Sequence, residues 1–516
     1  MTSHPQSRSA LPSQRQSSSS PAGHSWSAPH LVPDDRSVAE LCETVDPLIP
    51  GAPKLTVIGT GYLGATHAVC MAARGYEVIG VDVDPDKVEA LQAGHIPFHE
   101  PGLQELLEQV RDLGRLRFTT SFEEAADFGD VHFVCVGTPQ QVDGLGANLD
   151  FVRGAVEALA VHLHRPALVV GKSTVPVGTA AALATLVRSL APAGDEVELA
   201  WNPEFLREAH AVADTMAPDR LVFGVTSSRA EATLRRAFQP VIARGTPVEV
   251  MDLATSELVK VAANSFLATK ISFINAMSEI CDLVGADVRS LSSALAHDER
   301  IGARFLTPGL GFGGGCLPKD IRAFRARVDE LGGGRSVDFL HQVDLINERC
   351  RARVYDLTRE LLGGSVVGRR VAVLGAAFKP DSDDIRDSPA LDVATRLSAA
   401  GAVVRVTDPA AVPNARRSRP ELTYCDTALE ACQDADAVLL LTEWSDFTQL
   451  PPAELHDVVR TPVVVDARHV LDGDTWTAAG WVYRAPGAPA DRFDRALETP
   501  VQDDLRAFEP VEHLAS

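Results

Sequence analysis

The sequence predicts an α/β fold in which two doubly wound Rossmann-like domains are joined by a central helical region with a long connecting helix. Short apolar runs that end in glycine or polar residues alternate with helical patterns at 55–171 and again at 370–466. Continuous apolar runs are typical of strands buried in parallel sheets, and their alternation with helices indicates doubly wound sheets. From 252 to 362 the chain shows helical patterns and almost no strand signal.

Eight apolar runs define the predicted strands. They lie at 55–59, 77–82, 131–136 and 167–171 in the first sheet, and at 370–375, 403–408, 437–441 and 463–466 in the second. A helix is predicted at 65–74, directly after the first strand. Long helices predicted at 257–284 and 339–362 would link the two sheets and could supply a dimer surface.

Both ends of the chain are predicted to lack regular structure. Residues 1–50 are rich in Ser, Pro, Gln and His, and the tail after 490 is acidic and Pro-rich without clear periodicity. Such compositions favour disorder because they bury too little apolar surface. A short helix at 34–43 is the one element expected within the N-terminal tail.

The composition is that of an ordinary globular protein, with 516 residues, 45% of them hydrophobic and 23% charged. The net charge of −22 argues against a nucleic-acid or anionic-membrane partner. The eight cysteines are scattered without a CxxC pattern, which fits reduced cytosolic thiols and not a disulfide framework or a metal site. No apolar run suits a membrane helix or a signal peptide, so a cytoplasmic location is expected.

A G-x-G-x-x-G motif, Gly59-Thr60-Gly61-Tyr62-Leu63-Gly64, follows the first strand and opens a helix. Asp82 ends the second strand about 20 residues later, which completes a dinucleotide-binding fingerprint. The glycines would let the helix N-terminus meet a pyrophosphate, and Asp82 would accept from ribose hydroxyls, which favours NAD over NADP. Lys87 could lie near the same ribose or be a solvated helix lysine, and a tight turn without a ligand is the alternative for the motif.

A second glycine-rich stretch, residues 311–320, contains a single cysteine. Four glycines in five positions precede Cys316, and Lys319 and Asp320 follow it. Such a run is costly unless the backbone must approach a ligand closely. A nearby cation favours the reactive thiolate, so we interpret Cys316 as a covalent nucleophile. The alternative is a buried, inert thiol in a glycine-rich turn.

Two further segments combine carboxylates, a lysine and an amide. Glu204 and Glu208 lie four residues apart, so they would share one face if their segment is helical. Glu204 could be a general base or a first-turn residue that interacts with the helix dipole. Glu257, Lys260 and Asn264 share one helical stripe among small apolar residues. Lys260 is therefore either buried for function or extended to solvent.

The second sheet begins at 374–380 without the triple glycine of the first. A polar loop at 381–389 then runs into a helix. Lys379 and Arg386 could reach phosphates, and Ser388 could cap the helix. The pattern suggests a different, phosphorylated ligand, with a charged surface loop as the alternative.

Taken in order, these motifs resemble the UDP-glucose/GDP-mannose dehydrogenase family from residue 54 to 472 without a large gap. The shared motifs are GTGYLG at 59–64, EPGL at 100–103, VGTP at 136–139, STVPVGT at 173–179, NPEFLRE at 202–208, KVAAN at 260–264, RIG at 300–302, the Cys316 loop, Phe378-Lys379 and TEW at 442–444. The RIG and TEW motifs look more like the UDP-glucose branch than the GDP-mannose branch.

The resemblance implies an NAD-dependent, four-electron oxidation of UDP-glucose at C6 to UDP-glucuronate, without release of the aldehyde. The catalytic residues that it implies are Cys316, Lys260, Glu204, Asn264, Asp320 and Thr174. Lys260, Asn264 and Asp320 would flank the reacting oxygen. Cys316 would form a thiohemiacetal and then a thioester, which water would hydrolyse with Glu204 as base. Thr174 would help to position water and cofactor.

The fingerprint and the resemblance together give the expected binding residues. Those for NAD are Gly59, Gly61, Tyr62, Leu63, Gly64, Asp82, Lys87, Thr138, Thr174, Glu208 and Lys319. Those for the UDP-sugar are Glu204, Phe205, Leu206, Lys260, Asn264, Arg300, Phe305, Gly309, Gly313, Phe378, Lys379 and Arg468. Arg300 would reach the sugar site across a dimer interface, so a homodimer or higher homo-oligomer is expected.

The expected domain organisation has five parts. They are a disordered tail (1–50), an NAD-binding Rossmann domain (51–250), a central helical and dimerisation region with the nucleophile loop (251–362), a UDP-sugar-binding Rossmann-like domain (363–490) and a C-terminal tail (491–516).

Three departures from the family pattern leave the exact sugar open. Gly315 stands where a serine is common, His99 where a tyrosine is common, and Ala209-His210 where glycine and an aromatic residue are common. One alternative is a GDP-mannose 6-dehydrogenase or another nucleotide-sugar 6-dehydrogenase. An alternative of another class is a catalytically silent nucleotide-sugar-binding protein, which would need neither the thiol nor the lysine.

Overall fold

The computed structural model describes residues 45–489. The predictions for the chain ends fall mostly outside this range, at 1–44 and 490–516, and the helix expected at 34–43 lies there as well. Residues 45–50 form neither helix nor strand, but they contact the first sheet domain. The Asp46 N–H donates to Ala73 O at 2.8 Å, and the Asp46 carboxylate pairs with Arg74 at 3.1 Å.

The first sheet has eight strands in the order β3-β2-β1-β4-β5-β6-β7-β8. All neighbours are parallel except β6 and β7, which pair antiparallel through Trp201 and Gly224. The strands are β1 (Leu55–Ile58), β2 (Val78–Val81), β3 (Leu116–Thr119), β4 (Val131–Val134), β5 (Ala167–Gly171), β6 (Val197–Trp201), β7 (Leu221–Gly224) and β8 (Val248–Met251). The four strands predicted here are confirmed, and β3, β6, β7 and β8 are additional.

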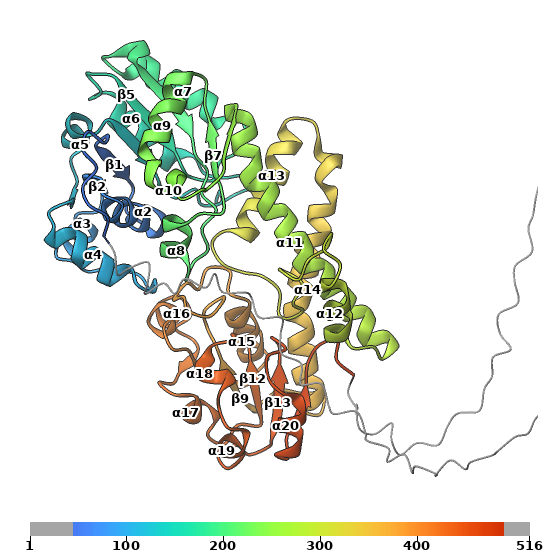
Figure 1. Cartoon of the computed structure of the whole chain (residues 1–516). Helices are drawn as coiled ribbons and strands as arrows, with labels where there is room; N and C mark the ends of the chain where they lie inside the picture. Colours follow the sequence, from blue (N-terminus) through green and yellow to red (C-terminus); the bar gives the residue numbers. More distant parts are fainter. Residues whose placement is uncertain (1–44, 490–516) are drawn as a thin grey trace, which may run out of the picture.

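Helices cover both faces of this sheet (Figure 1). Buried side chains of α2 and α4 pack in one core, and those of α5, α6 and α7 pack in a second. The helices are α2 (Tyr62–Ala73), α3 (Pro85–Gln92), α4 (Leu103–Asp112), α5 (Phe122–Phe128), α6 (Asp150–Ala160), α7 (Thr179–Leu190), α8 (Ala211–Met216), α9 (Ser228–Ala237) and α10 (Gln239–Ala243), with a 3-10 turn η1 (Gly194–Glu196).

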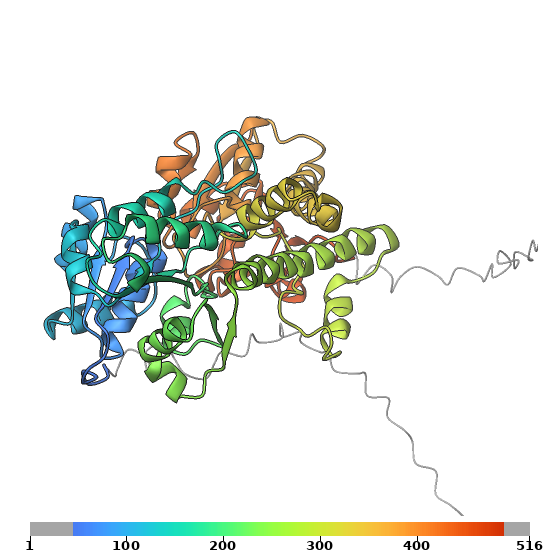
Figure 2. The ribbon, with the colours of Figure 1, turned by 90° about the horizontal axis from the view of Figure 1, so that it is seen from above.

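The central region is helical, as predicted. Its elements are α11 (Leu253–Val284), α12 (Val288–Ala296), α13 (Leu317–Glu330), the 3-10 turn η2 (Gly334–Val337) and α14 (Asp338–Leu361). Ala268 of α11, Ile321 of α13 and Leu340 of α14 share one small core. Seen from above, α11 runs as a single long rod along one side of the molecule (Figure 2). The two long helices expected at 257–284 and 339–362 are thereby confirmed.

The second sheet has six parallel strands in the order β11-β10-β9-β12-β13-β14. They are β9 (Arg370–Leu374), β10 (Val403–Thr407), β11 (Thr423–Tyr424), β12 (Ala437–Leu440), β13 (Val463–Asp466) and β14 (Val482–Arg484). Its helices are α15 (Pro389–Ala399), α16 (Val412–Ser418), α17 (Ala428–Cys432), α18 (Ser445–Thr448), α19 (Pro452–His456) and α20 (Gly473–Ala478). Ser388 caps α15 by accepting from the Leu391 N–H, as predicted.

The two sheets meet through loops that follow their strands. Lys379, in the loop after β9, donates to the backbone oxygen of Glu208, which lies in the segment after β6. Arg386 of the same loop pairs with the Glu208 carboxylate at 3.2 Å. Ligands of doubly wound sheets bind outside the carboxyl ends of the strands, so this seam is where a site is expected. Both sheets, joined by α11 and α14, confirm the predicted fold class (Figure 1).

Candidate active site

The turn between β1 and α2 is built so that only glycine fits. Gly59 has φ of 87°, and a Cβ there would lie 2.6 Å from Val136 Cγ1. A Cβ on Gly64 would lie 1.8 Å from Gly59 O, whereas one on Gly61 would meet nothing within 4 Å. No side chain caps the N-terminus of α2. The helix end is therefore open at Gly61, as the close approach of a pyrophosphate requires.

Asp82 lies beside this turn with its carboxylate already oriented. Its Oδ2 accepts from the Thr60 N–H at 2.8 Å and from Lys87 Nζ at 3.0 Å. Burial opposes ionisation, but these donors lower the pKa of Asp82 below its usual value. Asp82 is thus an anion at the place where a ribose would lie, and Lys87 is its ion-pair partner. The glycines and Asp82 together fit the adenosine half of NAD.

Tyr62 faces away from the turn and braces a neighbouring segment. Its hydroxyl donates to Glu100, and the same carboxylate accepts the N–H groups of Ala209 and Ala211 at 2.8 and 2.7 Å. Ala209 has φ of 64°, the left-handed region that favours glycine, at the position where the family pattern commonly has glycine. Leu63 packs against the core of the first sheet. Tyr62 therefore acts on the site through Glu100 and the backbone.

A pocket between the first sheet and α13 unites three of the predicted cofactor residues. Thr138, Thr174 and Lys319 all line it, together with Asp320 and Val261. The Thr138 hydroxyl donates to Thr174 O at 2.8 Å, which fixes the loops after β4 and β5 to each other.

The predicted polar residues of α11 and α13 meet at one point. Lys260 Nζ lies 3.1 Å from Glu204 Oε1, and Asn264 Nδ2 donates to Asp320 Oδ2 at 2.6 Å. Lys260 is only 5% exposed, so its extension to solvent was the wrong alternative. Burial opposes its charge, but the carboxylates of Glu204 and Asp320 and the thiol of Cys316 raise the pKa of Lys260 above its usual value. Lys260 therefore remains an ammonium ion.

Cys316 lies directly before α13 and is the exposed free thiol among the cysteines of residues 45–489. It is open to solvent on one side and enclosed by protein on the others. This enclosure and the Asp320 carboxylate raise the pKa of Cys316 to about 11. Lys260 and Lys319 lower the pKa of this thiol, as expected of nearby cations, but burial and Asp320 outweigh them. Lys319 forms an ion pair with Asp320, which offsets its effect on the thiol.

The segment 202–208 is not helical, which corrects the expectation that Glu204 and Glu208 share a helix face. Glu204 Oε2 accepts from the Leu206 N–H at 2.8 Å in a tight turn, and α8 begins only at Ala211. Glu204 faces Lys260, whereas Glu208 faces the second sheet. Burial and the neighbouring Asp384 raise the pKa of Glu208 to about 7, against the opposing effect of Arg386. The Phe205 ring lies beside Lys260, 5.5 Å from Nζ to the ring centroid.

The nucleophile loop is held by the second sheet. A Cβ on Gly313 would lie 2.3 Å from the backbone oxygen of Asp387, and one on Gly309 would lie 2.8 Å from that of Ala467. Arg468 donates to Gly311 O at 3.4 Å and to Phe378 O at 3.2 Å. The expected substrate residues Gly309, Gly313, Phe378, Lys379 and Arg468 thus converge around one loop.

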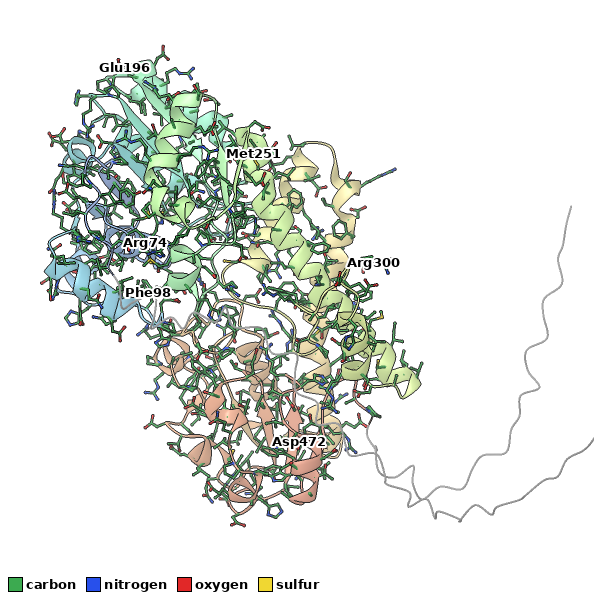
Figure 3. The ribbon with its side chains drawn as sticks, in the orientation of Figure 1. Arg74, Phe98, Glu196, Met251, Arg300 and Asp472 are labelled. Carbon is green, nitrogen blue, oxygen red and sulfur yellow. The ribbon has the colours of Figure 1, made fainter. Side chains whose placement is uncertain are left out.

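Three predicted residues do not reach this site within one chain. Arg300 is 89% exposed at its side chain and pairs with Asp298, on the outer side of the central helices (Figure 3). Phe305 is exposed and has φ of 63°. Glu257 lies on the stripe with Lys260, but its carboxylate accepts the N–H groups of Gly178 and Ala180 at the start of α7. Lys260 and Asn264 of the stripe therefore reach the site, whereas Glu257 caps the start of α7.

Sequence reasoning missed Lys172 and the contact that Arg386 makes with the nucleophile loop. The Arg386 guanidinium occupies the space beside Gly315, and its backbone oxygen accepts from Gly314 N at 2.8 Å. The polar loop suggested a phosphate ligand there, not a contact with the nucleophile loop. Lys172 is buried at the end of β5 and donates to Asn202 Oδ1 at 2.9 Å. Its signal was a lysine placed between a buried strand and the STVPVGT motif.

Residues 45–489 show neither a metal centre nor a membrane-spanning helix. No group of three His, Cys, Asp or Glu side chains there is placed to hold a metal ion. No helix in that range combines the length and apolarity needed to cross a bilayer.

An open dinucleotide cradle, a second Rossmann-like sheet and a thiol, lysine and carboxylates between them define an NAD-dependent dehydrogenase of the nucleotide-sugar class. The family models agree in chain order. Residues 53–242 match the NAD binding domain, 254–349 the central domain and 372–473 the UDP binding domain of the UDP-glucose/GDP-mannose dehydrogenase family. The chain belongs to this family, as the sequence motifs predicted.

Named relatives and a solved structure extend over most of the chain. The chain is 40% identical over 439 residues to UDP-glucose 6-dehydrogenase YwqF of Bacillus subtilis, covering 84% of this chain and 98% of that protein. It is 38% identical to the UDP-glucose 6-dehydrogenase of Rhizobium meliloti, covering 84% and 100%. A UDP-glucose dehydrogenase structure from Pyrobaculum islandicum superposes with a TM-score of 0.79 at 37% identity, covering 86% of this chain and 100% of that one.

Proposed function

We propose that this chain oxidises UDP-glucose at C6 to UDP-glucuronate in two NAD-linked steps, with the aldehyde held covalently on Cys316. The observation that carries the proposal is the convergence of Cys316, the Lys260–Glu204 ion pair and the Asn264–Asp320 hydrogen bond at one seam. The relatives named UDP-glucose 6-dehydrogenase, at 37–40% identity, favour this sugar over GDP-mannose.

In the first step the protein must stabilise charge that develops on the C6 oxygen. Lys260, a buried ammonium, and Asn264 supply this stabilisation in a site of low dielectric. Asp320, directly or through water, accepts the hydroxyl proton. The turn at 59–64 and Asp82 would hold NAD, which would supply the hydride acceptor for C6. The aldehyde product then faces the Cys316 thiol.

The second step begins when Cys316 Sγ bonds to the aldehyde carbon. A carboxylate takes the thiol proton as the S–C bond forms, because the pKa of about 11 keeps the resting thiol protonated. Loss of a hydride from the thiohemiacetal carbon, for which a second NAD would be the acceptor, and of the hydroxyl proton to a carboxylate would leave a thioester on Cys316. Water then attacks the thioester carbonyl, Glu204 accepts the water proton, and the C–S bond breaks to release the acid. Thr174 would orient this water.

Binding of the two ligands is divided between the two sheets in this proposal. The turn at 59–64, Asp82 with Lys87, and the pocket of Thr138, Thr174 and Lys319 hold NAD, with Glu208 at its edge. Phe378, Lys379 and Arg468, with the backbone at 309–313, hold the UDP-sugar. The domains would then be 51–250 for NAD, 251–362 for the nucleophile loop and dimerisation, and 363–490 for the UDP-sugar.

We also propose a homodimer or larger homo-oligomer, located in the cytoplasm. Phe266, Phe273 and Ile280 recur every seven residues along α11 and are 67%, 47% and 47% exposed. Such an apolar stripe on a long helix is typical of a helix–helix interface. Pairing of two chains along this stripe would let Arg300 and Phe305 reach the active site of the partner chain. Neither residue reaches the site of its own chain. The free cysteines of residues 45–489 fit a reducing compartment.

The test is NADH formed per mole of sugar, measured side by side for UDP-glucose and GDP-mannose. Two NADH per UDP-glucose and none from GDP-mannose is the expected result. Two per GDP-mannose would move the chain to the sister activity and leave the mechanism intact. One NADH per sugar, with free aldehyde, would remove Cys316 from its role, and no NADH from either sugar would favour a silent binder.

A further inference from the structure

We propose that Lys172 is a positioning residue, which fixes the catalytic carboxylate Glu204 through the side chain of Asn202. This inference rests on the proposed function, because it assigns a residue to the hydrolysis of the Cys316 thioester. Lys172 itself does not touch the reacting atoms. It lies at the end of β5, inside the core of the first sheet domain.

Lys172 is a buried lysine outside any ion pair of the described residues. It is 6% exposed, and its Nζ lies 5.9 Å from the Phe133 ring centroid and 5.7 Å from that of Phe238. Across residues 45–489, no carboxylate forms an ion pair with it, and its hydrogen-bond acceptor is Asn202 Oδ1 at 2.9 Å. Burial lowers the pKa of Lys172, while the charges of Cys135 and Glu204 oppose this effect.

A lysine in this position is hard to explain by stability. Burying an ammonium with one neutral acceptor costs several kcal/mol, whereas a methionine of similar length would fill the same space with an apolar chain. The aromatic rings offset part of the cost, since each contact contributes on the order of 1 kcal/mol. The hydrogen bond of Lys172 to Asn202 therefore points to a role in positioning that side chain.

Asn202 links Lys172 to the position of Glu204. Its backbone N–H donates to Gly171 O at 2.8 Å, its Nδ2 donates to Val222 O at 2.9 Å, and its Oδ1 accepts from Lys172. Asn202 is thus held at three points, two residues before Glu204. From there the chain enters the tight turn in which Glu204 Oε2 accepts the Leu206 N–H at 2.8 Å.

Loss of this positioning should slow the last chemical step, the hydrolysis of the thioester. Glu204 must lie within hydrogen-bond reach of the water that attacks the thioester. Without the Lys172 ammonium, Asn202 Oδ1 loses its donor and the turn loses one of its three anchors. A displacement of about 1 Å at such a base can cost on the order of 100-fold in rate. The thioester should then form normally and hydrolyse slowly.

The test compares Lys172→Met with wild type in rapid mixing of enzyme with UDP-glucose and NAD. The variant is expected to form two NADH per active site in a burst and then to turn over at least about tenfold more slowly. Because the slowed step follows both oxidations, kcat/KM for UDP-glucose and for NAD should stay within about twofold of wild type. Intact mass should show an acyl adduct on Cys316. Phe238→Leu is the matched control, because it alters the same core wall without touching Asn202, and it should leave no adduct.

Two further variants keep the test decisive if Lys172→Met folds poorly. Asn202→Ala should also accumulate the adduct, and in the double variant the effect should not exceed that of either single change, because both act on one path. Lys172→Arg, which keeps a cationic donor, should recover part of the steady-state rate. A steady-state rate within about twofold of wild type, or slow turnover without an adduct, would overturn the inference. Absence of NADH from UDP-glucose in wild type would instead overturn the proposed function.

Discussion

At the residue scale, the same two carboxylates keep one central group of the site charged and the other neutral. Glu204 and Asp320 help to raise the pKa of both Lys260 and Cys316. For Lys260 this preserves the ammonium ion that a developing alkoxide needs. For Cys316 it preserves the neutral thiol, so the resting site is unreactive toward other electrophiles until an aldehyde lies beside it.

Glu208 gives a stability prediction that depends on pH. Its pKa is about 7 in the folded protein, against a usual value near 4.5, so the folded state holds a proton that the unfolded state has lost. Stability contributed by this proton is complete at low pH and is lost as pH rises through about 4.5 to 7. Glu208→Gln removes the loss, so it should raise the free energy of unfolding at pH 8 by about 1–3 kcal/mol and change it little at pH 5.

The measurement is thermal or urea unfolding of the ligand-free protein at both pH values. Glu105→Gln, at an exposed glutamate of α4, is the matched control and should show no such difference. An equal effect of Glu208→Gln at pH 5 and pH 8, or destabilisation at pH 8, would show that Glu208 does not carry a retained proton.

At the scale of elements, the nucleophile loop supplies a matched pair of glycine substitutions. A Cβ on Gly313 would meet the Asp387 backbone oxygen at 2.3 Å, whereas one on Gly315 would meet the movable guanidinium of Arg386 at the same distance. Gly313→Ala must displace backbone, so we expect a loss of about 2–4 kcal/mol or a shifted loop, and at least about a 100-fold lower kcat. Gly315→Ala should lower kcat by less than about tenfold.

Steady-state kinetics with unfolding curves checks this pair. Similar losses in both variants would mean that the loop is not fixed by its contact with the second sheet. Because Gly315 departs from the serine common in the family, tolerance at this position would also explain the departure, since Arg386 can give way to a small side chain.

Burial on both faces made some strands predictable from the sequence, but not all of them, because β7 is fully buried and β6 nearly so, and neither was predicted. β1, β2, β4 and β5 are continuous apolar runs, and all four were found. β3 alternates buried and exposed positions, and β8 has none buried, so neither resembles a buried parallel strand. A helix was one possibility for the segment 202–208, in which Glu204 and Glu208 would share a face, but its turn is set by local hydrogen bonds to Asn202 and Glu204.

The site was predictable from motifs as a set of residues, and less so as a set of contacts. The ion pair of Lys260 with Glu204 joins a helix to a loop 56 positions earlier in the chain. The spacing of residues along α11 cannot predict this contact. The same holds for Lys172, whose partner Asn202 lies on the next strand's end. Lys319 sits beside the thiol as expected, yet its charge is directed to Asp320. In each case the contact of the side chain depends on the tertiary structure and not on the local sequence.

At the scale of the whole molecule, the two sheets and the central helices each contribute one side of the site, and α11 presents its apolar stripe outward. Phe273→Glu should convert the proposed oligomer to a monomer, because a charge in a paired helix face is strongly unfavourable. Light scattering after size-exclusion chromatography measures the mass. Val142→Glu, at a fully exposed apolar residue elsewhere, is the control. A wild-type monomer, or an unchanged oligomer in Phe273→Glu, would contradict the proposed interface.

The activity of that monomer gives a second readout. Because Arg300 lies far from the site of its own chain, the monomer should lose most of its turnover while it retains its fold. Full activity of a Phe273→Glu monomer would show that no partner residue completes the site.

The central claim is that Cys316 carries the substrate between the two oxidations, and one measurement tests it most directly. Glu204→Gln is mixed with UDP-glucose and NAD, quenched in acid, and its intact mass and Cys316 peptide are determined. We expect a UDP-glucuronyl thioester on Cys316, two NADH for each adduct, release by hydroxylamine, and no adduct in Cys316→Ser. NADH formation with an unmodified Cys316, or with free aldehyde in solution, would contradict the account.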